Sequence, residues 1–170
     1  RKNIIFGFLG RLHKSKGLIP LMEAFNNYWS LYPKENVILK IAGDGDLKDQ
    51  IIDLSNKNIN CEYLGEIKYD EVDNFIKSIT VMIIPSISDN LVTVGIETLM
   101  HQKPLIISRN TGLSEYLQPS HDCIAINSTS ESIFNIICQV YKDEINLNKI
   151  SENGRKTYLD NFTIKNYCEQ

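Results

Sequence analysis

Two basic side chains, Arg11 and Lys16, stand in a short polar segment that begins at Gly10, directly after the first apolar run of the chain. A glycine permits a tight exit from a strand, arginine offers a planar fork of donors, and lysine supplies a point charge close to a helix start. Together with the free amides of that helix, these residues could bind a diphosphate. The segment matches neither G-x-x-x-x-G-K-S/T nor G-x-G-x-x-G. A solvated basic turn explains the same residues, so this segment alone leaves both interpretations open.

A second group of candidate residues follows the apolar run at residues 81–84. Asp89 lies in the loop, and Glu97 lies eight positions later in the early turns of an expected helix. A carboxylate accepts paired hydrogen bonds from vicinal hydroxyls, so two carboxylates at one mouth suit a ribose and a hexose. The amides of residues 90–93 lead into the helix and would attract an anion. Simple capping by Asp89 and a solvent-exposed charge at Glu97 are the alternatives, and both stay open.

An alternation of apolar runs and amphipathic segments has to position these side chains. The apolar runs predict six strands, at residues 4–9, 37–42, 61–64, 81–84, 105–107 and 124–126. Helices are expected between them, over 18–32, 47–56, 70–79, 94–101 and 113–117, then over 130–140 and once or twice within 149–170. Asp70 is expected to cap the third helix. The alternation predicts an α/β fold, a doubly wound parallel sheet of about six strands with helices on both faces, in one domain over residues 1–170.

The composition excludes several classes of protein. With 170 residues, a net charge of −3 and a pI near 5.6, the chain has no character of a nucleic-acid binder. The four cysteines lie far apart without a C-x-x-C pair, which argues against a disulfide framework or a zinc ribbon and favours the reducing cytoplasm. No apolar run approaches the roughly 18 residues of a membrane span. Because the chain begins with Arg1 rather than Met, we expect a piece of a longer polypeptide.

Five motifs in order carry a resemblance to a known family. They are G-R-L-x-x-x-K-G, G-D-G, P-S-x-S-D-N-L followed by Glu97, K-P-L-I-I-S, and T-G-x-x-E, and they fall within residues 4–162. This series resembles the C-terminal, nucleotide-sugar-binding half of family-4-type GT-B glycosyltransferases. The resemblance implies a Rossmann-like sheet, a separate N-terminal acceptor domain, retention of configuration, and no metal or other cofactor.

The resemblance also implies roles for individual residues. Arg11 and Lys16 match the basic pair that neutralises the donor diphosphate as the nucleotide leaves. Asp89 matches the carboxylate that contacts donor-sugar hydroxyls, and Glu97 matches the one that holds the ribose. Arg11, Lys16 and Asp89 are therefore the expected catalytic residues. The other donor-binding residues that the resemblance implies are Gly10, Gly43, Asp44, Glu66, Ile67, Asn90, Leu91, Val92 and Thr93.

Four places depart from the family pattern. Asp89 replaces a longer glutamate, Val92 replaces a frequent Gly or Pro, and Gln102 stands where a glycine is usual, so that turn is expected to be built differently. Asp122-Cys123 stands near a turn that usually contains glycine. These changes bear on substrate choice more than on donor binding.

The expected function is transfer of a sugar from a nucleotide-diphosphate sugar to a glycan or glycolipid acceptor, in glycan or polysaccharide biosynthesis. The alternatives are a catalytically inactive sugar-nucleotide-binding module and a sugar-nucleotide epimerase of the same fold. The isolated chain is expected to bind nucleotide weakly and to transfer negligible sugar, because the acceptor site lies in the missing half. A cytoplasmic location is expected, and a peripheral contact of the missing half with the inner face of a membrane stays open.

Overall fold

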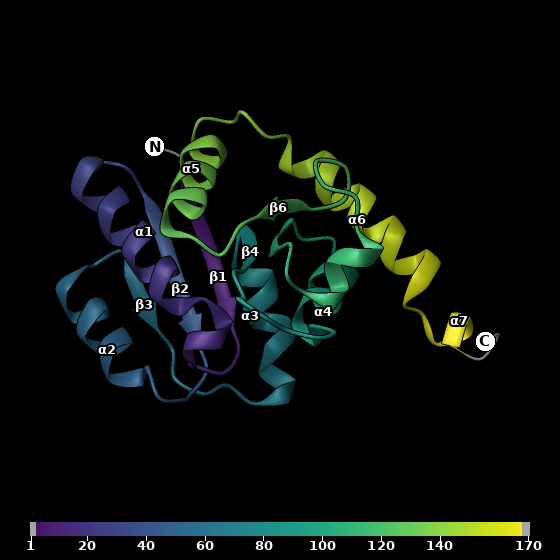
Figure 1. Cartoon of the computed structure of the whole chain (residues 1–170), viewed down its shortest axis with the longest axis horizontal. Helices are drawn as coiled ribbons and strands as arrows, with labels where there is room; N and C mark the ends of the chain where they lie inside the picture. Colours follow the sequence, from purple (N-terminus) through teal and green to yellow (C-terminus); the bar gives the residue numbers. More distant parts are fainter. Residues whose placement is uncertain (1–2, 168–170) are drawn as a thin grey trace.

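The computed structural model describes residues 3–167, which form one six-stranded sheet flanked by helices (Figure 1). The strand order is β3-β2-β1-β4-β5-β6, and every pairing is parallel. The strands are β1 (Ile4–Leu9), β2 (Val37–Ala42), β3 (Cys61–Tyr63), β4 (Val81–Ile84), β5 (Leu105–Ser108) and β6 (Ile124–Ile126). The predicted doubly wound parallel sheet of six strands is therefore confirmed.

The sheet extends from β1 in both directions, with β2 and β3 on one side and β4, β5 and β6 on the other. The first three strands build outward to one edge, and the chain then returns to place β4 on the other side of β1. β1 pairs with β2 along its whole length, from Ile4 opposite Val37 to Leu9 opposite Ala42, but with β4 only in its middle. Crossover helices on the two sides diverge at such a switch point, so the carboxyl ends of β1 and β4 border an open crevice.

Helices cover both faces of the sheet. α1 (Leu18–Leu31), α2 (Lys48–Lys57) and α5 (Ser130–Tyr141) pack on one face, and α3 (Val72–Ser78) and α4 (Thr93–Met100) pack on the other (Figure 1). Along β1, Ile4, Phe6 and Phe8 face the first layer, whereas Ile5 and Leu9 face the second. This double burial explains why the strand is a nearly continuous apolar run.

The remaining elements complete the α4 side and the loops. α6 (Leu147–Asn161) packs against α4, and α7 (Ile164–Tyr167) follows it toward the C-terminus (Figure 1). Short 3-10 helices occupy three loops: η1 (Lys14–Lys16), η2 (Tyr69–Glu71) and η3 (Gly112–Tyr116). Within the described range of 3–167, no helix is both long enough and apolar enough to cross a bilayer.

The structure corrects one local prediction. Asp70 lies inside η2 and does not cap α3; Glu71 instead accepts a hydrogen bond from the amide of Lys68 at 2.7 Å, at the start of η2. The short helix expected at 113–117 is present as the 3-10 helix η3, one residue earlier. The expected tail helices are α6 and α7, and the part of that prediction at 168–170 lies outside the described residues.

Candidate active site

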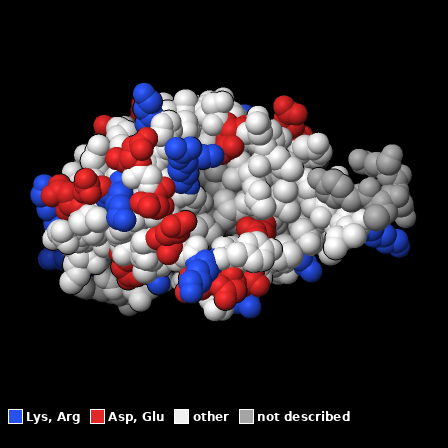
Figure 2. All heavy atoms as spheres, turned by 90° about the horizontal axis from the view of Figure 1, so that it is seen from below, with Lys and Arg blue, Asp and Glu red and all other residues white. Residues whose placement is uncertain are grey.

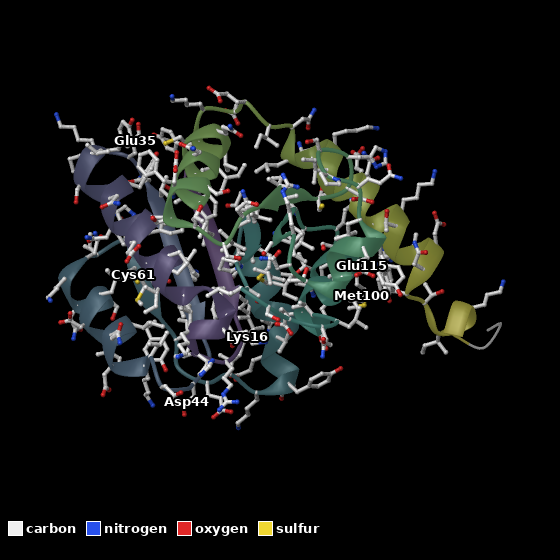
Figure 3. All side chains as sticks on the ribbon, in the orientation of Figure 1. Lys16, Glu35, Asp44, Cys61, Met100 and Glu115 are labelled. Atoms are coloured by element: carbon white, nitrogen blue, oxygen red, sulfur yellow. The ribbon has the colours of Figure 1, made fainter. Side chains whose placement is uncertain are left out.

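A pocket of about 670 Å³ opens at the carboxyl ends of β1 and β4, at the switch point of the sheet. Figure 3 places Lys16 and Asp44 together at this end of the molecule, and Figure 2 shows that the same face is hollowed near its centre, where acidic and basic side chains meet. The pocket is lined by Phe8, Leu9, Gly10, Arg11, His13, Ser15, Lys16, Val72, Ile84, Ser86, Asp89, Leu91, Val92, Thr93, Val94 and Glu97.

A smaller hollow of about 310 Å³ adjoins the pocket. The two share Leu9, Gly10 and Arg11, and the smaller one is completed by Gly43, Asp44, Glu66 and Ile67. Of the residues predicted for the site, only Asn90 lines neither. Its side chain is exposed, and its amide donates to the Asp89 carboxylate. The structure therefore brings twelve of the thirteen predicted residues to one edge of the sheet.

The loop that carries Lys16 is fixed against the loop that follows β4. Gly17 has a φ of 73°, and a Cβ built on it would lie 1.9 Å from the carbonyl oxygen of Pro85. Only glycine permits this approach without strain. The amide of Ile87 also donates to the carbonyl of Ser15 at 2.9 Å. Two segments about 70 positions apart in the sequence are thus held side by side; Lys16 and Asp89, one on each segment, are 73 positions apart.

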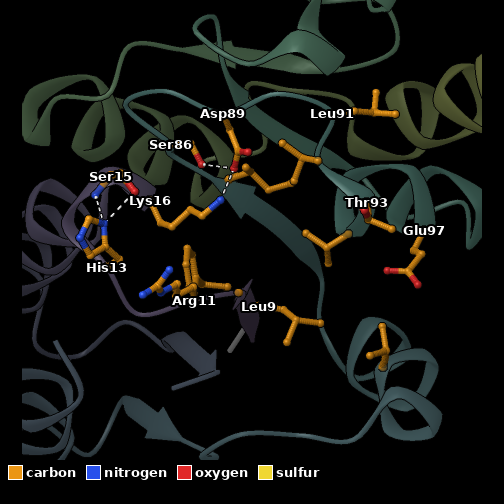
Figure 4. Close-up of a pocket in the computed structure, with 16 residues that line it drawn as sticks. Leu9, Arg11, His13, Ser15, Lys16, Ser86, Asp89, Leu91, Thr93 and Glu97 are labelled. Carbon is orange, nitrogen blue, oxygen red and sulfur yellow. Dashed lines mark hydrogen bonds and ion pairs between the residues drawn. The ribbon is translucent and has the colours of Figure 1, made fainter. Parts of the chain in front are cut away.

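Lys16 and Asp89 meet across this junction. The Nζ of Lys16 lies 2.5 Å from Oδ2 of Asp89, and the Ser86 hydroxyl lies 3.4 Å from the same oxygen (Figure 4). The other carboxylate oxygen, Oδ1, accepts from the amide of Asn90 at 2.9 Å. Asp89 does not cap α4, because the N-cap of that helix is Val92 and no side chain caps it. The alternative of simple helix capping by Asp89 is therefore wrong.

The uncapped start of α4 is part of the pocket wall. Thr93 and Val94, the first two residues of the helix, both line the pocket. The first amides of a helix have no partner within the helix and carry a partial positive charge. This helix start therefore favours an anionic group in the pocket.

Glu97 stands on the opposite side of the pocket from Lys16 and His13 (Figure 4). It is half-buried, and burial raises the pKa of its carboxyl above the ordinary value. The Asp73 carboxylate raises this pKa further, and His101 acts in the opposite direction. Glu97 is thus a partly desolvated acceptor at the pocket wall, and the alternative of a solvent-exposed helix charge is wrong.

Arg11 and His13 complete the basic side of the pocket. Arg11 is exposed and lines both hollows, so its guanidinium can reach a ligand that extends from one into the other. The Nδ1 of His13 accepts from the amide of Ser15 at 3.2 Å and caps η1. Its Nε2 lies 3.7 Å from Asp46. The half-buried His13 therefore has a structural task in the loop, in addition to its place on the pocket wall.

The smaller hollow is built where the ends of β1, β2 and β3 converge. Gly43 has a φ of 142°, and a Cβ on it would lie 1.8 Å from the carbonyl oxygen of Gly10. The amide of Gly43 donates to the carbonyl of Gly65, and the hydroxyl of Tyr63 donates to the carbonyl of Gly43, each at 2.8 Å. These contacts leave a shallow, backbone-rich wall that suits a flat group.

Sequence reasoning missed several residues of the pocket wall. Ser86 is almost fully buried below Asp89, and its position directly after the strand-ending Pro85 was the signal that could have found it. Phe8, Ile84 and Val72 also line the pocket, but their apolar type made them indistinguishable from core residues. Gln102 has a φ of 52°, which lies in the left-handed region that favours glycine.

A search of residues 3–167 for three or more clustered His, Cys, Asp or Glu side chains that could hold a metal ion finds none. The pocket is lined by a guanidinium, an ammonium and two carboxylates, and also by the His13 imidazole, three hydroxyl groups and backbone amides. This set can neutralise an anion and accept hydrogen bonds from hydroxyl groups in the same space.

Comparison with known proteins identifies the family of the chain. Residues 1–157 match the family described as glycosyl transferases group 1. An uncharacterized glycosyltransferase of Methanocaldococcus jannaschii is 30% identical over 114 residues, which are 65% of this chain and 28% of that protein. The alpha-monoglucosyldiacylglycerol synthase of Acholeplasma laidlawii is 26% identical over 166 residues, 95% of this chain and 41% of that protein. The chain spans less than half the length of these relatives.

Solved structures share the fold at low sequence identity. The C-terminal domain of a glycosyl transferase group 1 family protein from Francisella tularensis has a TM-score of 0.81 at 17% identity, over 96% of this chain and 87% of that chain. HepE from Anabaena, solved in complex with UDP-glucose, has a TM-score of 0.82 at 19% identity, over 98% of this chain and 47% of that chain. The fold is the Rossmann-like half of a GT-B structure, and with the family match over nearly its whole length the chain belongs to the glycosyl transferases group 1.

Proposed function

We propose that this chain is the donor-binding domain of a glycosyltransferase that moves a sugar from a nucleotide-diphosphate sugar to an acceptor. The observation that carries the proposal is the facing arrangement of cations and carboxylates in one pocket. Lys16 and the start of α4 supply positive potential, whereas Asp89 and Glu97 supply acceptors for hydroxyl groups. A sugar nucleotide presents both kinds of group, a diphosphate between two hydroxyl-bearing rings.

Each part of the donor has a matching part of the site. The diphosphate is placed near Lys16, Arg11 and the amides of α4, the ribose near Glu97, and the transferred sugar near Asp89. The base is assigned to the smaller hollow, whose wall includes Glu66 and Ile67. Arg11 lines both hollows and so stands between the places assigned to base and diphosphate.

The same groups can lower the barrier to transfer. Negative charge builds on the departing β-phosphate as the bond to the sugar breaks, and cations fixed beside that oxygen stabilise the transition state more than the ground state. Arg11 and Lys16 would do this without a metal ion, and no cofactor is part of the proposal. The acceptor, and the second domain that holds it, belong to the rest of the polypeptide. Transfer with retention of the anomeric configuration, in the synthesis of a glycan or glycolipid in the cytoplasm, completes the proposal.

The relatives support this assignment by what they bind or make. HepE from Anabaena has been solved with UDP and with UDP-glucose, and the Acholeplasma laidlawii relative is a synthase of a glucosylated diacylglycerol. A nucleotide-diphosphate hexose is accordingly the first donor class to test.

The test is sugar transfer by the full-length polypeptide that contains this domain. Lys16→Ala is expected to lower transfer about 100-fold or more, which is typical of the loss of one preorganised charge at a transition state. Lys14→Ala is the matched control, because Lys14 is an exposed lysine of the same short loop that does not line the pocket. Glu97→Ala is compared in the same way with Glu23→Ala, on the exposed side of α1.

The outcomes separate the alternatives. Transfer that survives both pocket variants at the level of their controls would contradict the proposal. A full-length protein that binds sugar nucleotides but transfers nothing would be the inactive binding module, and release of an epimerised donor in the absence of any acceptor would indicate the epimerase. The anomeric configuration of the product, determined by NMR, tests retention.

A further inference from the structure

The Asp89 carboxylate is already occupied by groups of the protein itself. A carboxylate offers about four acceptor positions on its two oxygens. One position on Oδ1 is taken by the amide of Asn90 at 2.9 Å. Both positions on Oδ2 are taken, by the Lys16 ammonium at 2.5 Å and the Ser86 hydroxyl at 3.4 Å. A pair of vicinal sugar hydroxyls needs two acceptor positions, so Asp89 cannot accept both while Lys16 stays in place.

This ion pair is built into the scaffold. The two side chains come from loops that Gly17 and Pro85 hold in van der Waals contact and that the Ile87–Ser15 hydrogen bond joins. The Lys16 side chain is 28% exposed and the Asp89 side chain 18%, so water screens the pair less than it screens an ion pair on an open surface. The pair is therefore expected to be more favourable than an ion pair between fully exposed side chains.

A diphosphate is a stronger partner for Lys16 than a carboxylate is. It carries more than one negative charge and several acceptor oxygens, and it would lie between the ammonium and the start of α4. On the proposed function, in which Lys16 neutralises the donor diphosphate, we infer that the Lys16–Asp89 ion pair is a latch. The diphosphate draws Nζ of Lys16 away from Asp89, and this frees Oδ2 to accept hydroxyls of the sugar.

The latch makes recognition of the sugar depend on recognition of the diphosphate. A free sugar meets a carboxylate with one open acceptor position, whereas a sugar that arrives on a diphosphate meets one with two. The buried Ser86 hydroxyl lies 3.4 Å from Oδ2, so it leaves room for one further donor at that oxygen once Lys16 is drawn away.

The latch predicts that one substitution affects two ligands differently. The ligands are the nucleoside diphosphate among UDP, GDP and ADP that the wild-type chain binds most tightly, and its glucose conjugate. In Asp89→Asn, Lys16 no longer has to leave a carboxylate, so the nucleoside diphosphate is expected to bind about 3- to 10-fold tighter. The glucose conjugate gains less or binds more weakly, because the charged acceptor for its hydroxyls is lost. Calorimetric titration measures both.

A double-mutant cycle separates the latch from a general change in charge. In a Lys16→Met background, Asp89→Asn is expected to change nucleoside diphosphate affinity by less than about 2-fold, because no ion pair remains to be broken. Asp46→Asn is the matched control. Asp46 is an exposed carboxylate near the same loop, beside His13, and its removal is expected to leave the affinity within about 2-fold of wild type.

The outcomes of these titrations distinguish failure of the latch from failure of the proposed donor site. If Asp89→Asn tightens nucleoside diphosphate binding equally with and without Lys16, or not at all, the latch is wrong and the proposed donor site still stands. If the wild-type chain binds none of the three nucleoside diphosphates, the latch and the proposed function both fail. If Asp89→Asn does not fold, a crystal structure of the wild-type chain with the sugar nucleotide decides: Nζ of Lys16 beyond 4 Å from Oδ2 supports the latch, and an intact 2.5 Å pair overturns it.

Discussion

The close approach of Gly17 to Pro85 gives a quantitative test of how the pocket is held. At the φ of 73° of Gly17, an alanine would cost about 1–2 kcal/mol of backbone strain. Alanine also lowers the conformational entropy of the unfolded chain, which offsets about 0.4–1 kcal/mol of that cost. The added Cβ would also lie 1.9 Å from the Pro85 oxygen and 3.1 Å from its Cβ, so the two loops must separate. Overpacking of this kind costs about 1–3 kcal/mol. Gly17→Ala is therefore expected to lose about 2–4 kcal/mol of unfolding free energy.

Gly65→Ala is the matched control for this prediction. Gly65 has a φ of 72°, nearly the same as Gly17, but no atom lies within 4 Å of the position its Cβ would take. Only the backbone contribution is left, and the expected loss is about 1 kcal/mol or less. The difference between the two variants isolates the steric contact between the loops.

Urea unfolding followed by tryptophan fluorescence measures both variants. Trp29 is the single tryptophan, it is buried, and its indole N–H donates to the carbonyl of Val37 at 2.8 Å, so its emission reports loss of the core. If the unfolding free energy falls with urea concentration at the same slope in wild type and variants, the extrapolated free energies can be compared directly. If Gly17→Ala and Gly65→Ala lose the same free energy within about 0.5 kcal/mol, the reasoning about the loop contact is refuted.

Two further predictions concern titratable groups. Burial and the Asp73 charge raise the pKa of Glu97 in the folded protein. The stability that Glu97 contributes is therefore fully present below the ordinary glutamate pKa, and it is lost as the pH rises through the pKa of the folded state. Glu97→Gln is therefore expected to unfold at higher urea than wild type near pH 7, with the gain vanishing toward about pH 4; a gain independent of pH would contradict this. Burial raises the pKa of Cys61 and of Cys123 to about 12, so iodoacetamide at about pH 8 should label neither until the chain unfolds, as mass spectrometry of native and denatured samples would show.

The sheet could be predicted from the sequence because its strands are buried on both faces. Residues 4–9 and 81–84 consist almost entirely of apolar side chains, and each run ends at a glycine or proline that marks the strand exit. Local features outside the strands have weaker signals. Asp70 is a good capping residue by type, but η2 begins earlier and places it inside the turn. The short helix at 112–116 is too brief for periodicity to distinguish a 3-10 helix from an α-helix.

The site could be predicted as a set of residues but not as a geometry. The rule that ligands bind beyond the carboxyl ends of parallel strands predicts that Lys16, Asp89 and Glu97 lie at the same edge of the sheet. The ion pair between Lys16 and Asp89 spans 73 positions, and only the folded loops reveal that these two side chains contact each other. The left-handed φ of Gln102 also lies outside what residue type predicts, because glutamine rarely adopts it.

Direct titration of the chain with UDP-glucose, GDP-glucose and ADP-glucose tests the central claim, that this pocket binds a nucleotide-diphosphate sugar. Saturable one-to-one binding of at least one of them is predicted, with loss of affinity in Lys16→Ala and unchanged affinity in Lys14→Ala. The absence of saturable binding by all three, or equal affinity in the two lysine variants, would contradict the account.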